Sequence, residues 1–135
     1  MCKFNKLVDI AIAMFDPERD LKSFHYSFIL YKNRVISIGQ NNRKTNPVNI
    51  KNLPHKEAKV IESIKGTCSE YHAIQKLKSK TNIQTDKCIM INIRIDRNKD
   101  ISYSKPCNYC RNLLRYFNFK RVYFSTPAGK FEIYE

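Results

Sequence analysis

The stretch CIMINIRI, residues 88–95, decides the fold of the 135-residue chain. Its apolar and β-branched side chains predict a β-strand. After a charged turn at residues 96–100, apolar side chains recur at helical spacing over residues 107–117 and predict a helix. Residues 121–125 predict a second strand. Residues 131–134 are a candidate last strand, which must pair antiparallel because a parallel connection needs about a dozen residues or more.

The beginning of the chain predicts a helix and a β-hairpin. Residues 4–15 repeat apolar side chains at helical spacing, and Pro17 ends this helix because the residue before a proline avoids the α conformation. Residues 24–31 and 34–38 are aromatic and β-branched. The two residues between them are a connection of the length that a hairpin turn uses.

The middle of the chain predicts a long loop and two helices. Residues 39–56 are polar, residues 58–64 predict a short helix that stops at Gly66, and residues 68–78 predict a helix with one apolar side. The alternation of helices and strands predicts an α/β fold in which a mixed sheet is flanked by helices. We find no linker and no internal repeat, so we expect residues 1–135 to form one domain.

The composition excludes some classes of protein and leaves others open. No apolar run approaches the roughly 18 residues of a spanning helix, and the first residues lack a signal peptide's apolar region. We therefore expect a soluble cytoplasmic protein with no membrane partner. The net charge of +13 fits a protein that meets phosphate groups on nucleotides or nucleic acid. The alternative explanation of the charge is the codon usage of an AT-rich genome, which would account for the abundance of Lys, Asn and Ile in the chain.

The five cysteines are more consistent with a metal or catalytic site than with a disulfide framework, because their number is odd and no secretory signal precedes them. Cys107 and Cys110 open a predicted helix, where this spacing places both sulfur atoms on one face near the positive end of the helix dipole. Cys68 opens another predicted helix and offers a third thiolate. Three protein ligands leave a fourth position on zinc for water, as in catalytic sites.

Glu70 is placed to act beside such a site. Zinc lowers the pKa of a bound water to about 7 in hydrolytic enzymes, and a neighbouring carboxylate can pass the proton to a leaving amine. Alternatives remain: Cys107 and Cys110 can belong to a structural zinc half-site or a redox pair, and His72 can replace Cys68 as a ligand.

The segments TCSEYHAI, residues 67–74, and KPCNYC, residues 105–110, resemble the zinc-dependent cytidine/deoxycytidylate deaminase superfamily, whose pattern is His/Cys-x-Glu followed by Pro-Cys-x-x-Cys. The resemblance includes Gly39-Gln40-Asn41 and the strand at residues 121–125, and it covers roughly residues 24–126. It implies a cytidine deaminase-like three-layer α-β-α sandwich with a mixed five-stranded sheet. It also implies one Zn²⁺ per chain, bound by three cysteines: Cys68, Cys107 and Cys110.

The resemblance also implies roles at the substrate. Glu70 would be the catalytic proton shuttle, the backbone around Ser69 would contact the base, and Asn41 would hold a sugar hydroxyl. Phe24 is a candidate for stacking on the base, with a place in the core as its alternative. Nucleoside-type relatives have a ribose-binding glutamate where this chain has Arg43, a cation that suits a 5′-phosphate instead. A nucleic-acid backbone and plain solvent are the alternative partners of this cation.

The expected activity is hydrolytic deamination of a free cytosine nucleoside or nucleotide to the uracil form, with release of ammonia. Cysteine in the first motif and an antiparallel end of the sheet resemble the nucleoside branch of the superfamily, which includes blasticidin-type enzymes and implies a homotetramer or dimer. An enzyme that edits single-stranded RNA or DNA, and a zinc-binding structural module without turnover, are the alternatives.

Overall fold

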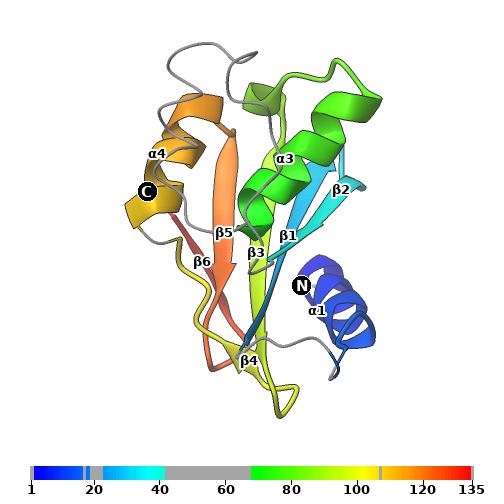
Figure 1. Ribbon diagram of the computed structural model, residues 1–135, viewed down its shortest axis with the longest axis vertical. Helices are drawn as coiled ribbons and strands as arrows, with labels where there is room; N and C mark the ends of the chain where they lie inside the picture. The colour runs from blue at the N-terminus through cyan, green and yellow to red at the C-terminus, as the bar shows by residue number, and fades with distance from the viewer. Residues whose placement is uncertain (1, 17, 19–22, 42–67, 107, 135) are drawn as a thin grey trace.

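The computed structural model describes residues 2–16, 18, 23–41, 68–106 and 108–134. In this part of the chain one mixed sheet lies between helices on both of its faces, which confirms the predicted three-layer α/β sandwich (Figure 1). The predicted short helix at 58–64, Pro17, Arg43 and Cys107 lie outside the described residues, as does most of the predicted loop.

The sheet contains the predicted strands and one more. The strands lie side by side in the order β2-β1-β3-β5-β6, and β4 also pairs with β3. β3 and β5 are parallel, whereas the other described pairs are antiparallel, including the predicted β5–β6 end. The strands are β1 (Ser23–Tyr31), β2 (Arg34–Gln40), β3 (Ile89–Asp96), β4 (Ile101–Ser102), β5 (Arg121–Ser125) and β6 (Phe131–Ile133).

The turn between β1 and β2 confirms the predicted hairpin and explains how it closes without glycine. Lys32 and Asn33 both have positive φ, 49° and 66°. Two consecutive left-handed residues form the turn whose twist matches that of the flanking strands, and Asn tolerates this conformation better than most residues. The strand pairing therefore compensates the local cost at Lys32.

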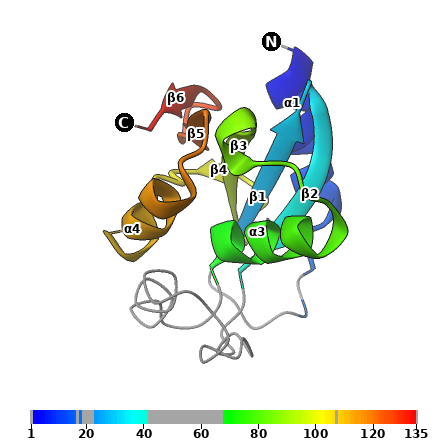
Figure 2. The ribbon, with the colours of Figure 1, turned by 90° about the horizontal axis from the view of Figure 1, so that it is seen from above.

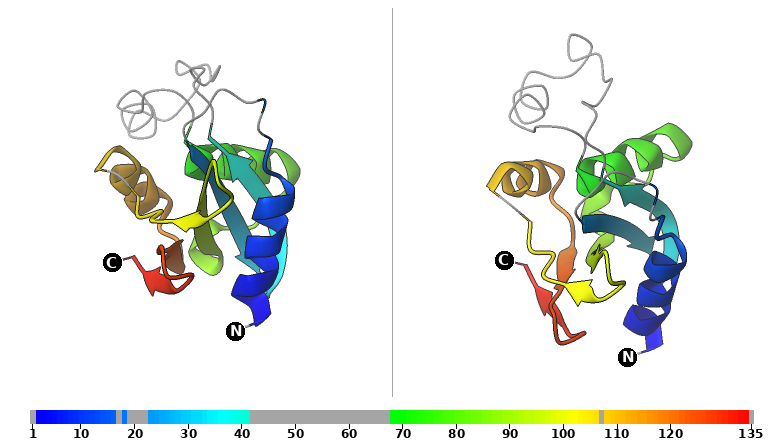
Figure 3. Two further views of the ribbon diagram at one scale, coloured as in Figure 1. Left: turned by 90° about the horizontal axis from the view of Figure 1, so that it is seen from below. Right: turned by 60° about the horizontal axis from the view of Figure 1, so that its bottom comes forward.

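Three described helices cover the sheet. α1 (Cys2–Ala13) packs on one face, while α3 (Ser69–Lys80) and α4 (Asn108–Phe117) pack on the other (Figures 2 and 3). A short 3₁₀ helix, η2 (Thr85–Lys87), precedes β3. None of the described helices is long and apolar enough to cross a membrane.

Side-chain alternation divides β1 between the two faces. Phe24, Tyr26, Phe28 and Leu30 are buried in the cluster that contains residues of α1, whereas Ile29 is buried with residues of α3 and α4. Because side chains alternate along a strand, the intervening Ser27 faces α3. This is the face on which the polar residues of the sheet gather.

The first turns of α3 lie unusually close to β2, and glycine makes this approach feasible. A Cβ atom on Gly39 would overlap the backbone of α3 at Ser69 O and Ala73 N. The contact is reinforced where Ser37 Oγ donates to Ala73 O at 2.7 Å and Lys76 Nζ donates to Ile38 O at 2.8 Å. The start of α3 is thereby held against the sheet.

Candidate active site

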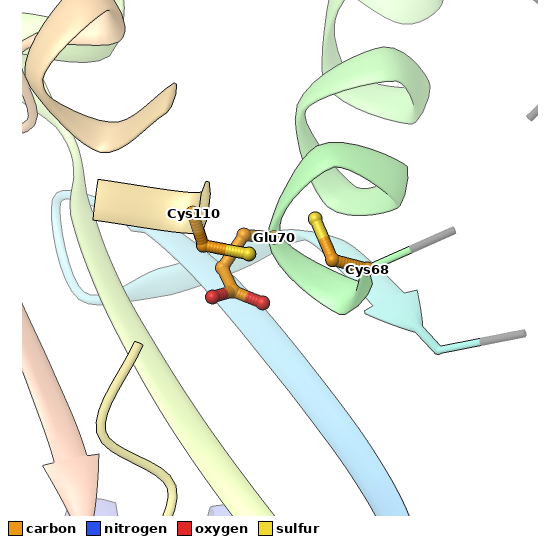
Figure 4. Close-up of side chains that lie close together, drawn as sticks. All are labelled: Cys68, Glu70 and Cys110. Atoms are coloured by element: carbon orange, nitrogen blue, oxygen red, sulfur yellow. The ribbon is translucent and has the colours of Figure 1, made fainter. Parts of the chain in front are cut away.

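Cys68, Glu70 and Cys110 meet between the starts of α3 and α4 (Figure 4). Their sulfur and carboxylate atoms all lie within 4.8 Å of one another, a grouping that can hold a metal ion. Cys68, Cys88 and Cys110 are free thiols. Two sulfur donors beside a carboxylate fit zinc, which favours thiolate ligands.

Local helix geometry brings these side chains together. Cys68 is the N-cap of α3, with φ −83° and ψ 153°, and its sulfur accepts a hydrogen bond from Tyr71 N at 3.4 Å. Glu70 follows in the first turn, and Cys110 lies in the first turn of α4. Because the N-terminal end of a helix dipole is positive, both helices favour negatively charged thiolate and carboxylate groups at this point.

Glu70 is almost entirely removed from solvent, with 6% of its surface exposed. Burial raises the pKa of its carboxyl, and hydrogen bonds with its own backbone, Ser69 and Cys110 oppose that rise. A carboxyl whose pKa is raised above its ordinary range is better matched to exchanging protons near neutral pH than an exposed glutamate is.

A buried polar chain connects Glu70 to the sheet. Ser69 Oγ donates to Glu70 Oε1 at 2.9 Å and lies 2.8 Å from Ser27 Oγ, which in turn donates to Asn92 Oδ1 at 2.6 Å. The two hydroxyl groups supply two protons for three contacts. The third proton comes either from a protonated Glu70 or from the Asn92 amide in its other orientation, since the two ends of an amide group are nearly indistinguishable in shape.

Asn92 also anchors the segment that leads to α4. Its carbonyl oxygen accepts a hydrogen bond from Ser104 Oγ at 2.8 Å, and Ser104 N donates to Ser125 O at 3.0 Å. Ser104 follows β4, and the chain runs on from there to the start of α4 (Figure 3). One residue of β3 therefore contacts both the approach to Cys110 and the chain that reaches Glu70.

His72 holds strand β2 against helix α3. Its Nδ1 accepts a hydrogen bond from Gln40 N at 2.9 Å, and the group of candidate ligands contains Cys68 but not His72. The histidine therefore has a positioning role at the α3–β2 contact.

A second group of polar side chains lies at the start of β1. Asn41 Oδ1 accepts from His25 N at 3.0 Å, and Asn41 Nδ2 donates to Ser23 O at 3.2 Å. His25 pairs across the strands with Arg94. Burial and the nearby charge of Arg94 lower the pKa of His25 to about 4, so its imidazole is neutral at pH 7.

The structure does not bring every candidate residue into the cluster. Ser69 lies within it and Asn41 lies at the start of β1, but the Phe24 ring is completely buried on the α1 face of the sheet. There it packs edge-on against Phe15 with ring centroids 4.7 Å apart, which is the core position named as its alternative. The packing of Phe24 thus supports the start of β1.

Sequence reasoning missed Ser27, Asn92, His25 and Arg94. A signal for two of them was present, because Asn92 and Arg94 are polar residues at alternate positions of an otherwise apolar strand. Such a pattern indicates a strand whose one face becomes polar toward its end. Only the strand register shows that these residues face Ser27 and His25.

Comparison with known protein families agrees with this geometry. The chain matches the family model described as the cytidine and deoxycytidylate deaminase zinc-binding region over residues 3–126. The matched range includes both cysteine motifs and the polar residues of β1 and β3. Comparison with curated proteins gives no match.

Proposed function

The chain belongs to the zinc-dependent cytidine and deoxycytidylate deaminase superfamily, and from this premise we propose that it deaminates a free cytosine nucleoside or nucleotide. The products would be the uracil form and ammonia. The observation that carries the proposal is the position of Glu70, a buried carboxyl of raised pKa next to the sulfur atoms of Cys68 and Cys110. A site that only stabilised the fold would have no use for a proton carrier in this place.

Cysteine residues would hold the metal. Cys68 and Cys110 present their sulfur atoms to the same point, and we propose Cys107 as the third ligand from the start of α4. Zinc supplies, when bound, the polarisation of the water that attacks the amino-bearing carbon of the base. The open position left by three protein ligands is what this chemistry requires.

Glu70 would move the protons of the reaction. Its carboxylate takes a proton from the attacking water and delivers it to the ring nitrogen of cytosine. The remaining proton of that water, now on the hydroxyl bound to the ring carbon, passes through the same carboxyl to the exocyclic amino group, and the C–N bond breaks to release ammonia. The hydrogen bond from Ser69 Oγ to Glu70 Oε1 fixes the orientation of the carboxyl through these transfers.

The neighbouring residues would orient the substrate. We propose that the backbone at Ser69 contacts the base, that Asn41 contacts a sugar hydroxyl, and that Arg43 meets a phosphate. The hydrogen bonds of Asn41 to His25 N and Ser23 O support this proposed role of Asn41, because they hold its side-chain amide beside the polar residues at the start of β1. The fold would further assemble into a homodimer or homotetramer.

An ammonia-release assay on protein of measured zinc content tests the proposal. The substrates are cytidine, deoxycytidine, CMP, dCMP, adenosine and a short single-stranded RNA. Glu70→Gln removes the ionisable carboxyl at nearly constant volume, and we expect it to lower kcat by about 10²–10⁴-fold while zinc content stays unchanged. Glu132→Gln, at an exposed position of β6, is the matched control.

Two results would overturn the proposal. Turnover by Glu70→Gln at the rate of the unmodified protein would remove the carboxyl from the reaction. Absence of zinc from carefully reduced protein would remove the metal on which the chemistry depends.

A further inference from the structure

We infer that Arg94, with His25 beside it, forms a subsite for an anionic group of the substrate, so that the enzyme favours a cytosine nucleotide over the uncharged nucleoside. The inference deepens the proposed function and rests on it. The residues that form the subsite belong to β1 and β3 and are separate from both cysteine motifs.

The register of the sheet places this subsite next to the catalytic carboxyl. Ser27 pairs with Asn92, and the next pair on the same face is His25 with Arg94. The first pair reaches Glu70 through Ser69. The second pair lies two residues farther along the strands, a distance of about 7 Å.

The guanidinium group of Arg94 lacks a strong partner. Its Nε is buried and has no hydrogen-bond partner, and its Nη1 makes only a long contact of 3.4 Å to Tyr103 O. No carboxylate pairs with Arg94 in the described part of the chain. A buried donor left unsatisfied costs free energy, and an anion with two oxygen atoms matches the geometry of the guanidinium fork.

Two neighbouring cations lie on the opposite face of the sheet from Arg94. Arg97 lies over the ring of Phe24 and Lys99 over the ring of Phe15, both on the α1 face. Arg94 is on the other face, next to His25. Arg94 is therefore the residue proposed for the subsite because of where its charge lies, and not because the chain as a whole is basic.

The polar groups follow the order of the parts of a nucleotide. Glu70 is at the proposed site of the base. Asn41, proposed for the sugar, bonds to the backbone at Ser23 and His25, two residues from Ser27 toward the start of β1. Arg94 lies across from His25 at that same end. A base, sugar and phosphate in this sequence would bring the phosphate to Arg94.

His25 completes the subsite as a neutral group at pH 7. The charged group that faces it is Arg94, and its Nε2 lies 3.3 Å from Ser23 Oγ. An anion bound to Arg94 would offset the positive charge and raise the pKa of His25. The ring therefore reports on occupation of the subsite.

Substitution of Arg94 tests the inference through the ratio of two substrates. For Arg94→Gln we expect the kcat/KM ratio of dCMP to deoxycytidine to fall at least tenfold, and for Arg94→Lys to fall less, because an ammonium keeps the charge and loses the fork. Arg115→Gln, at an exposed position of α4, should leave the ratio unchanged. An equal effect of Arg94→Gln on both substrates would overturn the inference.

A binding measurement separates this inference from the proposed function. In the zinc-loaded protein, we expect inorganic phosphate at constant ionic strength to shift the NMR titration of His25 to higher pH, and not to do so in Arg94→Gln. Phosphate binding that needs Arg94, in a protein that deaminates none of the cytosine compounds, would reject the proposed function and keep the subsite. Absence of the shift in the unmodified protein would reject the subsite.

Discussion

We infer that Ser27 orients the carboxyl of Glu70, the proposed proton carrier, through Ser69, although Ser27 lies far from both cysteine motifs in sequence. Its hydroxyl is the link between Asn92 on β3 and Ser69 on α3, at distances of 2.6 and 2.8 Å. All three residues are buried. A buried chain of this kind fixes rotamers, because each hydroxyl that turned away would leave another polar group unsatisfied.

Ser27→Ala should therefore loosen Glu70 without removing it. We expect stability to fall by about 1–2 kcal/mol, from loss of the buried hydroxyl that contacts both Asn92 and Ser69, and kcat to fall by about ten- to a hundredfold from misorientation of the carboxyl. KM and zinc content should change little, since the substituted hydroxyl contacts neither substrate nor metal. Steady-state kinetics and metal analysis check this.

Ser79→Ala is the control, because Ser79 lies on α3, the helix that carries Ser69 and Glu70, but is exposed. An increase in KM with unchanged kcat would contradict the positioning role of Ser27.

Sequence could predict the cysteine cluster but not the residues that support it. Motif spacing places Cys68, Glu70 and Cys110 at the starts of two helices, and helix geometry then determines which way each side chain points. Ser27 and Asn92 are 65 positions apart and meet only through the register of β1 and β3. That register depends on the packing of whole strands, which no local pattern reveals.

At the level of elements, the contact between β2 and α3 positions the start of α3, the helix that carries Glu70. Gly39 faces the backbone at Ser69 O and Ala73 N, and backbone atoms cannot move aside as a flexible side chain can. An added side chain would force β2 and the start of α3 apart, which would change the position of Ser69 and Glu70 relative to the sheet.

Gly39→Ala should accordingly impair both stability and activity. We expect a loss of about 1–3 kcal/mol from overpacking and a fall in kcat/KM of at least about a hundredfold from displacement of the carboxyl. Thermal unfolding and the ammonia assay measure the two effects.

Gly129→Ala separates stability from activity. Gly129 has φ +75° in the β5–β6 turn, so alanine there should cost about 1–2 kcal/mol by strain, but it does not touch α3. We expect its activity at 25 °C to be retained. If Gly39→Ala were as active as Gly129→Ala, the close approach would not position the site.

Within the described residues, the longer predicted helices and strands agree with the structure, whereas the predicted helix at residues 58–64 stays a prediction. The helices α1, α3 and α4 and the strands β1, β2, β3, β5 and β6 were all predicted. The two-residue strand β4 and the three-residue helix η2 were not, because two residues are too few to show a repeated alternation and three residues do not complete one turn of an α-helix. β4 forms because the neighbouring edge of β3 offers it backbone partners at Arg94 and Ile95.

At the scale of the whole molecule, the net charge of +13 and the charge of a single site have different effects on binding. A chain this basic attracts any polyanion, and such binding weakens steeply with salt because each phosphate contact releases a counterion. A free mononucleotide carries a single phosphate group, so even with both Arg94 and the proposed Arg43 near it, it makes far fewer such contacts than a polynucleotide does. Salt dependence therefore distinguishes a mononucleotide enzyme from one that acts on a polynucleotide.

Between about 50 and 200 mM salt we expect KM for dCMP to rise only a few-fold, whereas affinity for single-stranded RNA through six or more phosphate contacts would fall by roughly a hundredfold or more. Kinetics and fluorescence anisotropy on the same protein measure the two slopes. Because Arg94 supplies the expected contact to the mononucleotide, Arg94→Gln should flatten the slope for dCMP and leave the slope for RNA nearly unchanged. Deamination of RNA with the steep slope, and none of dCMP, would instead assign the basic surface to a polynucleotide substrate.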